Sequence, residues 1–170
     1  MSKLCSWATV AVLAASSLTV LAATSDKEAA RGKYLVNLAG CTDCHTPGYF
    51  LGKPDSSRFL AGSDVGFRVP GAGTFIGRNL TPDEDTGIGL WTIEQIVTAF
   101  TTGVRPDGRT LARVMPWTHY AELDASDKKA IAVYLKTLPP VRRLIPGPFG
   151  ADEEPPTLTW TITAPITPVP

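Results

Sequence analysis

The stretch Cys41-Thr42-Asp43-Cys44-His45 has the pattern C-x-x-C-H, which is the attachment sequence of a c-type haem. Two thiols three positions apart on one helical turn can each add to a vinyl group on the same edge of a porphyrin. The imidazole of His45, directly after the second cysteine, can then bind the iron from one face. The stretch therefore predicts one covalently bound haem c, attached at Cys41 and Cys44, with His45 as an axial iron ligand.

Two other kinds of site use paired cysteines, and both fit this sequence less well. A structural zinc site takes four ligands, and the C-x-x-C pair with the two histidines of the chain, His45 and His119, supplies that number. Adjacent Cys44 and His45 are poorly placed for tetrahedral geometry, however. A thioredoxin-like redox pair needs a strand before it and a helix starting at the first cysteine, whereas here a helix is expected before Cys41. Haem attachment is the favoured interpretation.

Two residues are candidates for the second axial position. Met115, in the run Val114-Met115-Pro116-Trp117, is the single methionine after the initiator, and His119 is the single histidine outside the attachment sequence. Pro116 favours an extended conformation at Met115, as a loop that turns a thioether inward needs. Met115 is therefore the predicted ligand, and a thioether opposite an imidazole raises the reduction potential. Packing in the apolar core is the alternative role of Met115.

Further residues are candidates to surround the haem. Aromatic side chains can wall the crevice and exclude water, and an arginine–asparagine pair at the end of a glycine-rich loop can hydrogen-bond the propionates. A series of arginines approaches Met115 along the chain and can line the exposed haem edge. Core packing and a solvated loop are the ordinary roles of such residues. The candidates are Trp91, Trp117, Phe75 and Tyr120 for the walls, Arg78 and Asn79 for the propionates, and Arg105, Arg109 and Arg113 for the edge.

The N-terminus predicts export. Lys3 precedes a mostly apolar run over residues 4–21 that ends in two alanines, which is the order of charge, apolar run and small residues in a secretory signal. We expect a signal peptide over residues 1–23 and a periplasmic mature protein. An uncleaved membrane anchor is the alternative. The third cysteine, Cys5, lies in this segment, so the mature chain keeps the C-x-x-C pair alone.

Apolar periodicity and capping residues predict three helices. Each has a polar residue that can accept a hydrogen bond from the first turn, and two of the three have a glutamate or glutamine partner for a capping box. The expected helices are residues 26–39 after Ser25, with Glu28 as its partner; residues 93–102 after Thr92, with Gln95 as its partner; and residues 127–137 after Ser126.

The segments between and after these helices are expected to be irregular. Residues 46–91 are rich in glycine and show no sustained periodicity, and so long a loop in a compact domain indicates a ligand at its centre. Residues 142–170 form an extended proline-rich tail. Within it Leu158, Trp160 and Ile162 alternate with threonines, which predicts a short strand or a docking strip. A tail folded back over its own domain is the alternative.

Several motifs are shared with a known family. They are Gly32-Lys33-Tyr34-Leu35 before the attachment sequence, Asn79-Leu80-Thr81-Pro82-Asp83, Thr86-Gly87-Ile88-Gly89-Leu90-Trp91-Thr92, Gly103-Val104-Arg105, Met115-Pro116-Trp117, Val133-Tyr134-Leu135 and Leu138-Pro139-Pro140-Val141. With these motifs, residues 32–141 resemble class I c-type cytochromes. They are most similar to the haem domains in cytochrome subunits of periplasmic alcohol, aldehyde and sugar-acid dehydrogenases.

The resemblance implies a cytochrome c domain over residues 24–141 with an all-α fold. Its first and last helices cross where Gly32 meets Tyr134, and the axial ligands are His45 and Met115. Those dehydrogenase subunits often carry several haem domains and a membrane anchor, whereas one C-x-x-C-H is present here. We therefore expect a single haem domain without a C-terminal anchor.

The sequence thus predicts a periplasmic monohaem cytochrome that carries electrons and is not itself an enzyme. The expected partners are redox proteins: a dehydrogenase or quinol-oxidising donor, and an oxidase or another cytochrome as acceptor. The protein is either a soluble shuttle or a subunit docked by its tail, with membrane contact through a partner or an uncleaved N-terminus. Sixteen basic residues balance sixteen acidic ones, which disfavours nucleic-acid binding. The alternative is a small haem enzyme, a peroxidase or a thiosulfate-type oxidoreductase, with a displaceable iron ligand.

Overall fold

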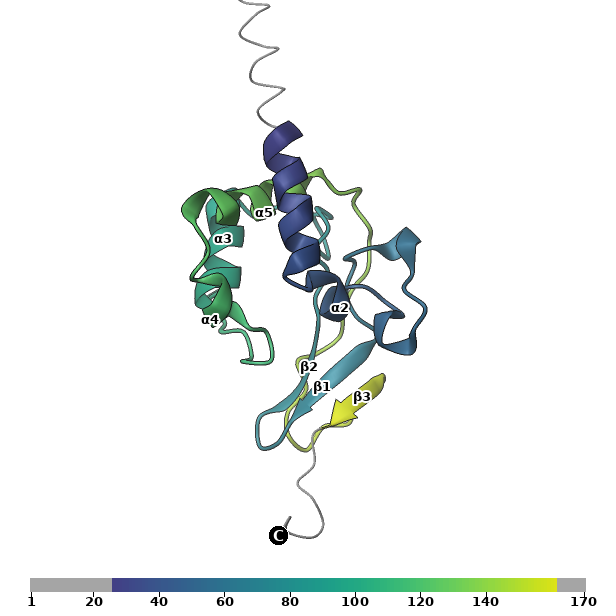
Figure 1. The fold of residues 1–170 in the computed structure, drawn as a ribbon. Helices are drawn as coiled ribbons and strands as arrows, with labels where there is room; N and C mark the ends of the chain where they lie inside the picture. Colours follow the sequence, from purple (N-terminus) through teal and green to yellow (C-terminus); the bar gives the residue numbers. More distant parts are fainter. Residues whose placement is uncertain (1–25, 162–170) are drawn as a thin grey trace, which may run out of the picture.

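The described part of the chain, residues 26–161 of a computed structural model, combines a group of helices with a small sheet (Figure 1). The expected signal peptide, the Ser25 cap and Ile162 lie outside this range. No helix between residues 26 and 161 has the length and apolar character needed to cross a membrane.

Two helices far apart in sequence cross in the helical part. The helix over residues 26–38 packs on α5 (Ala125–Thr137). A Cβ atom on Gly32 would lie 1.9 Å from the Ala130 carbonyl oxygen and 2.7 Å from Tyr134 Cβ. A glycine is needed for this approach, because any side chain would overlap the backbone of α5. The crossing of the first and last helices, with Gly32 against Tyr134, is confirmed.

The second expected helix, α3 (Ile93–Thr102), forms with the predicted capping box. The Gln95 amide donates to Thr92 Oγ1 at 3.2 Å, and the Thr92 amide donates to Gln95 Oε1 at 2.9 Å. The helix ends at Gly103, whose φ of 75° lies in the left-handed region that favours glycine.

The third helix begins earlier than the sequence indicated. Asp124, not Ser126, is the N-cap of α5, because the Asp124 carbonyl already accepts from the Lys128 amide at 3.0 Å. A single helical turn, α4 (Trp117–Tyr120), follows Pro116 and was not expected. The core lies between these helices and is built from apolar side chains that include Leu35, Val36, Leu60, Ile88, Ile96, Ile131 and Leu135.

A three-stranded sheet corrects the all-α expectation. Residues 46–91, expected to be irregular, contain an antiparallel hairpin of β1 (Val65–Val69) and β2 (Gly73–Ile76), together with the 3₁₀ turns η1 (Tyr49–Leu51) and η2 (Ser56–Arg58). The third strand, β3 (Leu158–Thr161), pairs in parallel with β1, which gives the order β2-β1-β3. The hairpin gave no clear strand signal, because β1 and β2 each contain a glycine, which is depleted in strands, and β2 ends in two adjacent apolar residues.

The described part of the tail, up to residue 161, folds back over the domain and joins the sheet through β3 (Figure 1). The Asn79 side-chain amide donates to the Val141 carbonyl at 2.7 Å, directly before the tail. Further along, Thr74 and Phe149 exchange two backbone hydrogen bonds of 2.9 and 3.0 Å. Two of the expectations for the tail, a short strand and a return over its own domain, are therefore both confirmed.

Candidate haem site

The attachment sequence forms its own short helix, α2 (Cys41–His45), at the wall of a large cavity. Gly40 precedes it in the left-handed conformation and turns the chain away from the helix over residues 26–38. Cys41 and Cys44 are free thiols, partly buried, and both line a cavity of about 580 Å³. We call this space the α2 cavity. Its volume lies within the range of cofactor sites in proteins.

His45 is fixed in one tautomer. Its side chain is buried, and Nδ1 lies 2.7 Å from the carbonyl oxygen of Arg78. A carbonyl oxygen can accept but not donate, so Nδ1 carries the proton and Nε2 keeps a free lone pair. Burial lowers the pKa of His45, although the bond to Arg78 opposes that shift. The lowered pKa favours the neutral imidazole, which is the form that binds a metal.

Two loops fasten the C-terminal end of α2. A Cβ atom on Gly77 would lie 1.6 Å from the Cys44 carbonyl oxygen, so the chain after β2 passes directly against α2. From another side, the Gly62 amide donates to the His45 carbonyl at 2.7 Å. The position of the imidazole is therefore set by contacts from both loops as well as by α2.

Met115 reaches the α2 cavity from the loop between α3 and α4. The loop is closed on itself, because the Leu111 amide donates to Gly103 O at 2.7 Å and the Met115 amide donates to Ala112 O at 3.0 Å. Met115 is partly buried and lines the cavity, whereas His119 is exposed on α4 and is not part of the lining. Of the two candidates for the second axial position, the structure thus brings Met115 to the same cavity as His45.

The thiols are not tuned for redox exchange. Burial is the main reason that the pKa of Cys41 rises to about 11, with the charges of Asp43 and Cys44 adding to it, and the pKa of Cys44 is raised as well. A thioredoxin-like pair needs a lowered thiol pKa instead. Within residues 26–161, no group of three or more histidine, cysteine, aspartate or glutamate side chains is arranged to hold a metal ion.

The predicted wall residues divide into two groups. Phe75, Trp91 and Tyr120 line the α2 cavity, and the Tyr120 hydroxyl donates to the Ala39 carbonyl at 2.9 Å, next to α2. Trp117 is not in the lining, which corrects that assignment. Its ring covers Gly103, where a Cβ atom would lie 2.7 Å from the indole.

The two residues expected to bind propionates have other partners. Asn79 borders the cavity, but its side-chain amide donates to Thr86 Oγ1 at 3.1 Å and to the Val141 carbonyl. Its amide group therefore holds the tail and is not free to donate into the cavity. Arg78 also lines the cavity, and its guanidinium donates to the carbonyls of Ile145 and Gly147. Both residues fasten the tail, a role that local sequence does not reveal.

Positive charge gathers at one edge of the cavity. Arg105 and Arg109 are in the lining, while Arg113 is exposed and stacks on Trp117 instead. Burial lowers the pKa of Arg78, and the nearby charges of Arg109 and Arg105 lower it further. Arg105 and Arg109 already pair with the Asp107 carboxylate, at 3.2 and 3.7 Å. A haem propionate at this edge would be a further carboxylate partner for the two guanidinium groups.

Several residues that line the cavity were not predicted from the sequence. Phe67 of β1 borders the cavity, as do Leu144, Ile145 and Pro148 of the tail. Ile145 is fully packed in the interior, with 4% of its surface exposed. A single apolar pair within a proline-rich run gives no periodicity, so the sequence offers little sign of this role.

The residues around the α2 cavity fit a haem c. Two free thiols on one short helix, a neutral imidazole with Nε2 available and a thioether all face one space. The remaining lining is largely apolar, with arginines at one edge. This donor set corresponds to thioether attachment with histidine and methionine ligation.

No known family profile matches the chain. The known proteins to which it is similar include several cytochrome subunits of bacterial dehydrogenases. The fructose dehydrogenase cytochrome subunit of Gluconobacter japonicus is 34% identical over 127 residues, or 71% of this chain and 24% of that protein. The diheme cytochrome c-type protein of Cereibacter sphaeroides is 32% identical over 120 residues, or 68% and 38%. The alcohol dehydrogenase (quinone) cytochrome c subunit of Gluconobacter oxydans is 29% identical over 134 residues, or 78% and 24%. The chain thus spans well under half the length of each of these relatives.

Proposed function

This chain is a c-type cytochrome, and we propose that it binds one haem c and transfers single electrons. Cys41 and Cys44 attach the haem, and His45 and Met115 are the axial ligands. One observation carries the proposal: these four side chains, from α2 and from the loop before α4, line a single cavity of about 580 Å³.

The residues of the chain prepare the site for electron transfer. When bound, the haem supplies an iron that cycles between its ferrous and ferric forms. The Arg78 carbonyl holds the His45 ring with Nε2 toward the cavity. The closed loop around Met115 holds the thioether. Ligands held on both sides change position little when the charge changes, which keeps the reorganisation small.

The cavity walls control water and charge. Apolar side chains, among them Phe75, Ile88 and Leu135, line the interior and exclude water from it. The guanidinium groups of Arg105 and Arg109 place positive charge at the edge, where they suit propionates and an acidic surface on a partner.

The names of the relatives suggest where such a protein acts. We propose that residues 1–23 direct export, that the cytochrome domain over residues 24–141 works in the periplasm, and that a dehydrogenase or quinol-oxidising protein is the electron donor. Fructose, alcohol and gluconate dehydrogenase cytochrome subunits are among the relatives. The acceptor is an oxidase or a further cytochrome.

The test is expression of the full chain in a bacterial host that matures c-type cytochromes. We expect the haem to stay on the chain after acid–acetone extraction, and the ferric protein to show the near-infrared band of a thioether ligand. The reduced protein is expected not to bind carbon monoxide at neutral pH. Haem that extracts freely would contradict attachment, and rapid carbon monoxide binding would favour the haem-enzyme alternative.

A further inference from the structure

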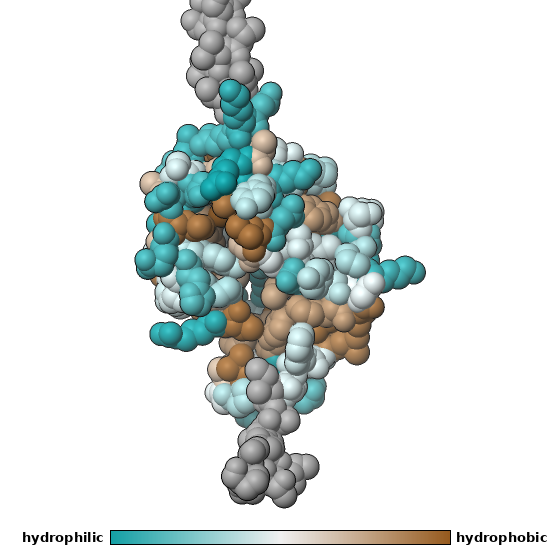
Figure 2. Space-filling view, in the orientation of Figure 1, coloured by the Kyte–Doolittle hydropathy of each residue, from teal (hydrophilic) through white to brown (hydrophobic). Residues whose placement is uncertain are grey.

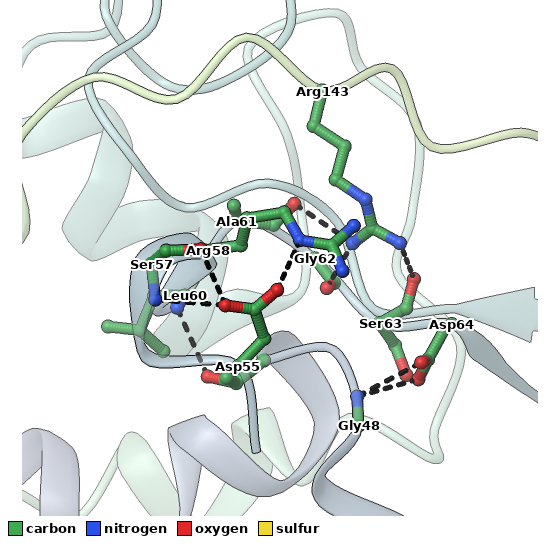
Figure 3. Close-up of polar contacts among 11 residues, drawn as sticks. Gly48, Asp55, Ser57, Arg58, Leu60, Ala61, Gly62, Ser63, Asp64 and Arg143 are labelled. Carbon is green, nitrogen blue, oxygen red and sulfur yellow. Dashed lines mark hydrogen bonds and ion pairs between the residues drawn. The ribbon is translucent and has the colours of Figure 1, made fainter. Parts of the chain in front are cut away.

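Arg143, in the tail, forms an unusually complete set of hydrogen bonds. Its partly buried guanidinium donates to three consecutive carbonyls, at 3.3 Å for Ala61, at 3.0 Å for Ser63, and to Gly62 between them (Figure 3). Its backbone amide donates to Thr86 Oγ1 at 2.9 Å. The planar guanidinium can bridge several acceptors at once, which a lysine ammonium at the same place cannot reproduce.

The loop that Arg143 binds is one of the two that hold the candidate axial histidine. The Gly62 amide donates to the His45 carbonyl at 2.7 Å, and the Ser63 amide donates to the Gly77 carbonyl at 2.9 Å. The next residue after Gly77 is Arg78, whose own carbonyl accepts from His45 Nδ1. The His45 carbonyl is thus bound directly to the loop that Arg143 fixes. The Arg78 carbonyl, which binds His45 Nδ1, is joined to the same loop through Gly77.

Arg78 is in turn hydrogen-bonded to the tail. Its guanidinium donates to the carbonyls of Ile145 and Gly147, just beyond Arg143. The Ile145 side chain packs so closely on Gly62 that a Cβ atom there would lie 2.6 Å from Ile145 Cδ1. We call residues 143–148 the strap. Its Ile145 and Pro148 line the α2 cavity. The strap is hydrogen-bonded to Arg78 and to the loop over residues 61–63, the two segments that contact His45.

We propose that Arg143 is a positioning residue for the axial histidine and that the strap it fastens is part of the haem site. This inference rests on the proposed function. Without the three carbonyl contacts, the strap opens, water enters the cavity beside His45, and the loop holding the His45 carbonyl loosens. Water near the iron favours the more highly charged ferric state, so the reduction potential falls.

The experiment compares three variants of the full-length, haem-loaded protein. Arg143→Gln removes the charge and the bridge, and Arg143→Lys keeps the charge but not the bridge. Arg31→Gln is the control, because this exposed arginine also forms an ion pair, with Asp127 at 2.7 Å, and neither residue lines the α2 cavity. The readouts are the reduction potential and amide hydrogen exchange at Gly62.

We expect a lowered potential in both Arg143 variants and no comparable shift in the control. Exchange at Gly62 should accelerate about tenfold or more, since hydrogen bonds from a charged group contribute more than neutral ones. If Arg143→Lys behaves like the unchanged protein, charge alone is responsible and the positioning role is wrong. If both Arg143 variants match Arg31→Gln, the strap has no influence on the site.

Haem attachment in the unchanged protein and the behaviour of the Arg143 variants are measured separately. If the unchanged protein lacks covalent haem, the proposed function fails before any variant is compared. If Arg143→Gln yields no mature protein, Arg143→Lys still decides, because lysine keeps the positive charge on a long side chain. In that case a lowered potential and faster Gly62 exchange in Arg143→Lys are enough to support the positioning role, and unchanged values overturn it.

Discussion

His45 Nδ1 lies 2.7 Å from the Arg78 carbonyl oxygen, across 33 positions of the chain. This contact decides which nitrogen of the imidazole faces the α2 cavity. It also links the attachment helix α2 to the segment after β2, where Gly77 passes against the Cys44 carbonyl. The candidate ligand is therefore placed by a hairpin that no local sequence pattern indicated.

Loss of both thiols should separate haem binding from haem attachment. In the Cys41→Ser, Cys44→Ser double variant, no thioether bond can form, so acid–acetone should remove all haem from the chain. Each single variant should retain one bond. Haem staining after denaturing electrophoresis measures this, with Thr42→Ala as the control within the same helix. Retained haem in the double variant would refute attachment at these residues.

Replacement of Met115 should expose the iron on one side. Met115→Leu keeps an apolar side chain but no sulfur, so the ferric near-infrared band should disappear, the potential should fall, and the reduced protein should bind carbon monoxide. His119→Gln is the comparison, since His119 is exposed on α4. Identical spectra for Met115→Leu and the unchanged protein would exclude Met115 as the ligand.

The helix crossing should tolerate no side chain at Gly32. Gly32→Ala places a Cβ atom 1.9 Å from the Ala130 carbonyl oxygen, and such overpacking lowers the free energy of unfolding by about 1–3 kcal/mol. Gly150→Ala is the matched control, because a Cβ atom added there would have its nearest neighbour, Glu153 Oε2, at 3.6 Å. Denaturant unfolding of both variants tests this, and equal midpoints would argue against the crossing.

Asp55 should stabilise the protein down to strongly acidic pH. Its carboxylate accepts from Ser57 and pairs with Arg58 (Figure 3), which lowers its pKa from 3.8 to about 2. A lowered pKa gives stability that is present above pH 3.8 and is lost as the pH falls through about 2. Asp55→Asn should therefore destabilise the protein at neutral pH, with a difference that shrinks over this range. Thermal melts at stepped pH measure it, and Asp152→Asn, at an exposed site, is the control. A difference independent of pH would contradict this origin.

An apolar surface over the sheet lies outside the predicted site. Figure 2 shows apolar residues gathered over the end of the molecule that carries η1, β1 and β3. Leu51, Leu158 and Trp160 are exposed there, and the Trp160 ring stacks on Phe67 with centroids 6.0 Å apart. Since Phe67 also lines the α2 cavity, this surface connects the tail to the site wall.

The sequence by itself determined those features that depend on residues close together in the chain. The C-x-x-C-H spacing defines the attachment helix, and Thr92 with Gln95 defines the start of α3, because five and four consecutive residues suffice for them. The motifs also indicated Gly32 at the helix crossing. Met115 could be proposed as a ligand because the chain has one methionine after the initiator.

Only the tertiary structure decided which residues meet across long separations. The sheet joins Val65–Val69 to Leu158–Thr161, and Arg143 reaches a loop some 80 residues earlier. Asn79 and Arg78 turned from expected cavity donors into contacts of the tail for the same reason. Such partners are selected by packing and by the need to satisfy buried carbonyls, and neither leaves a local pattern in the sequence.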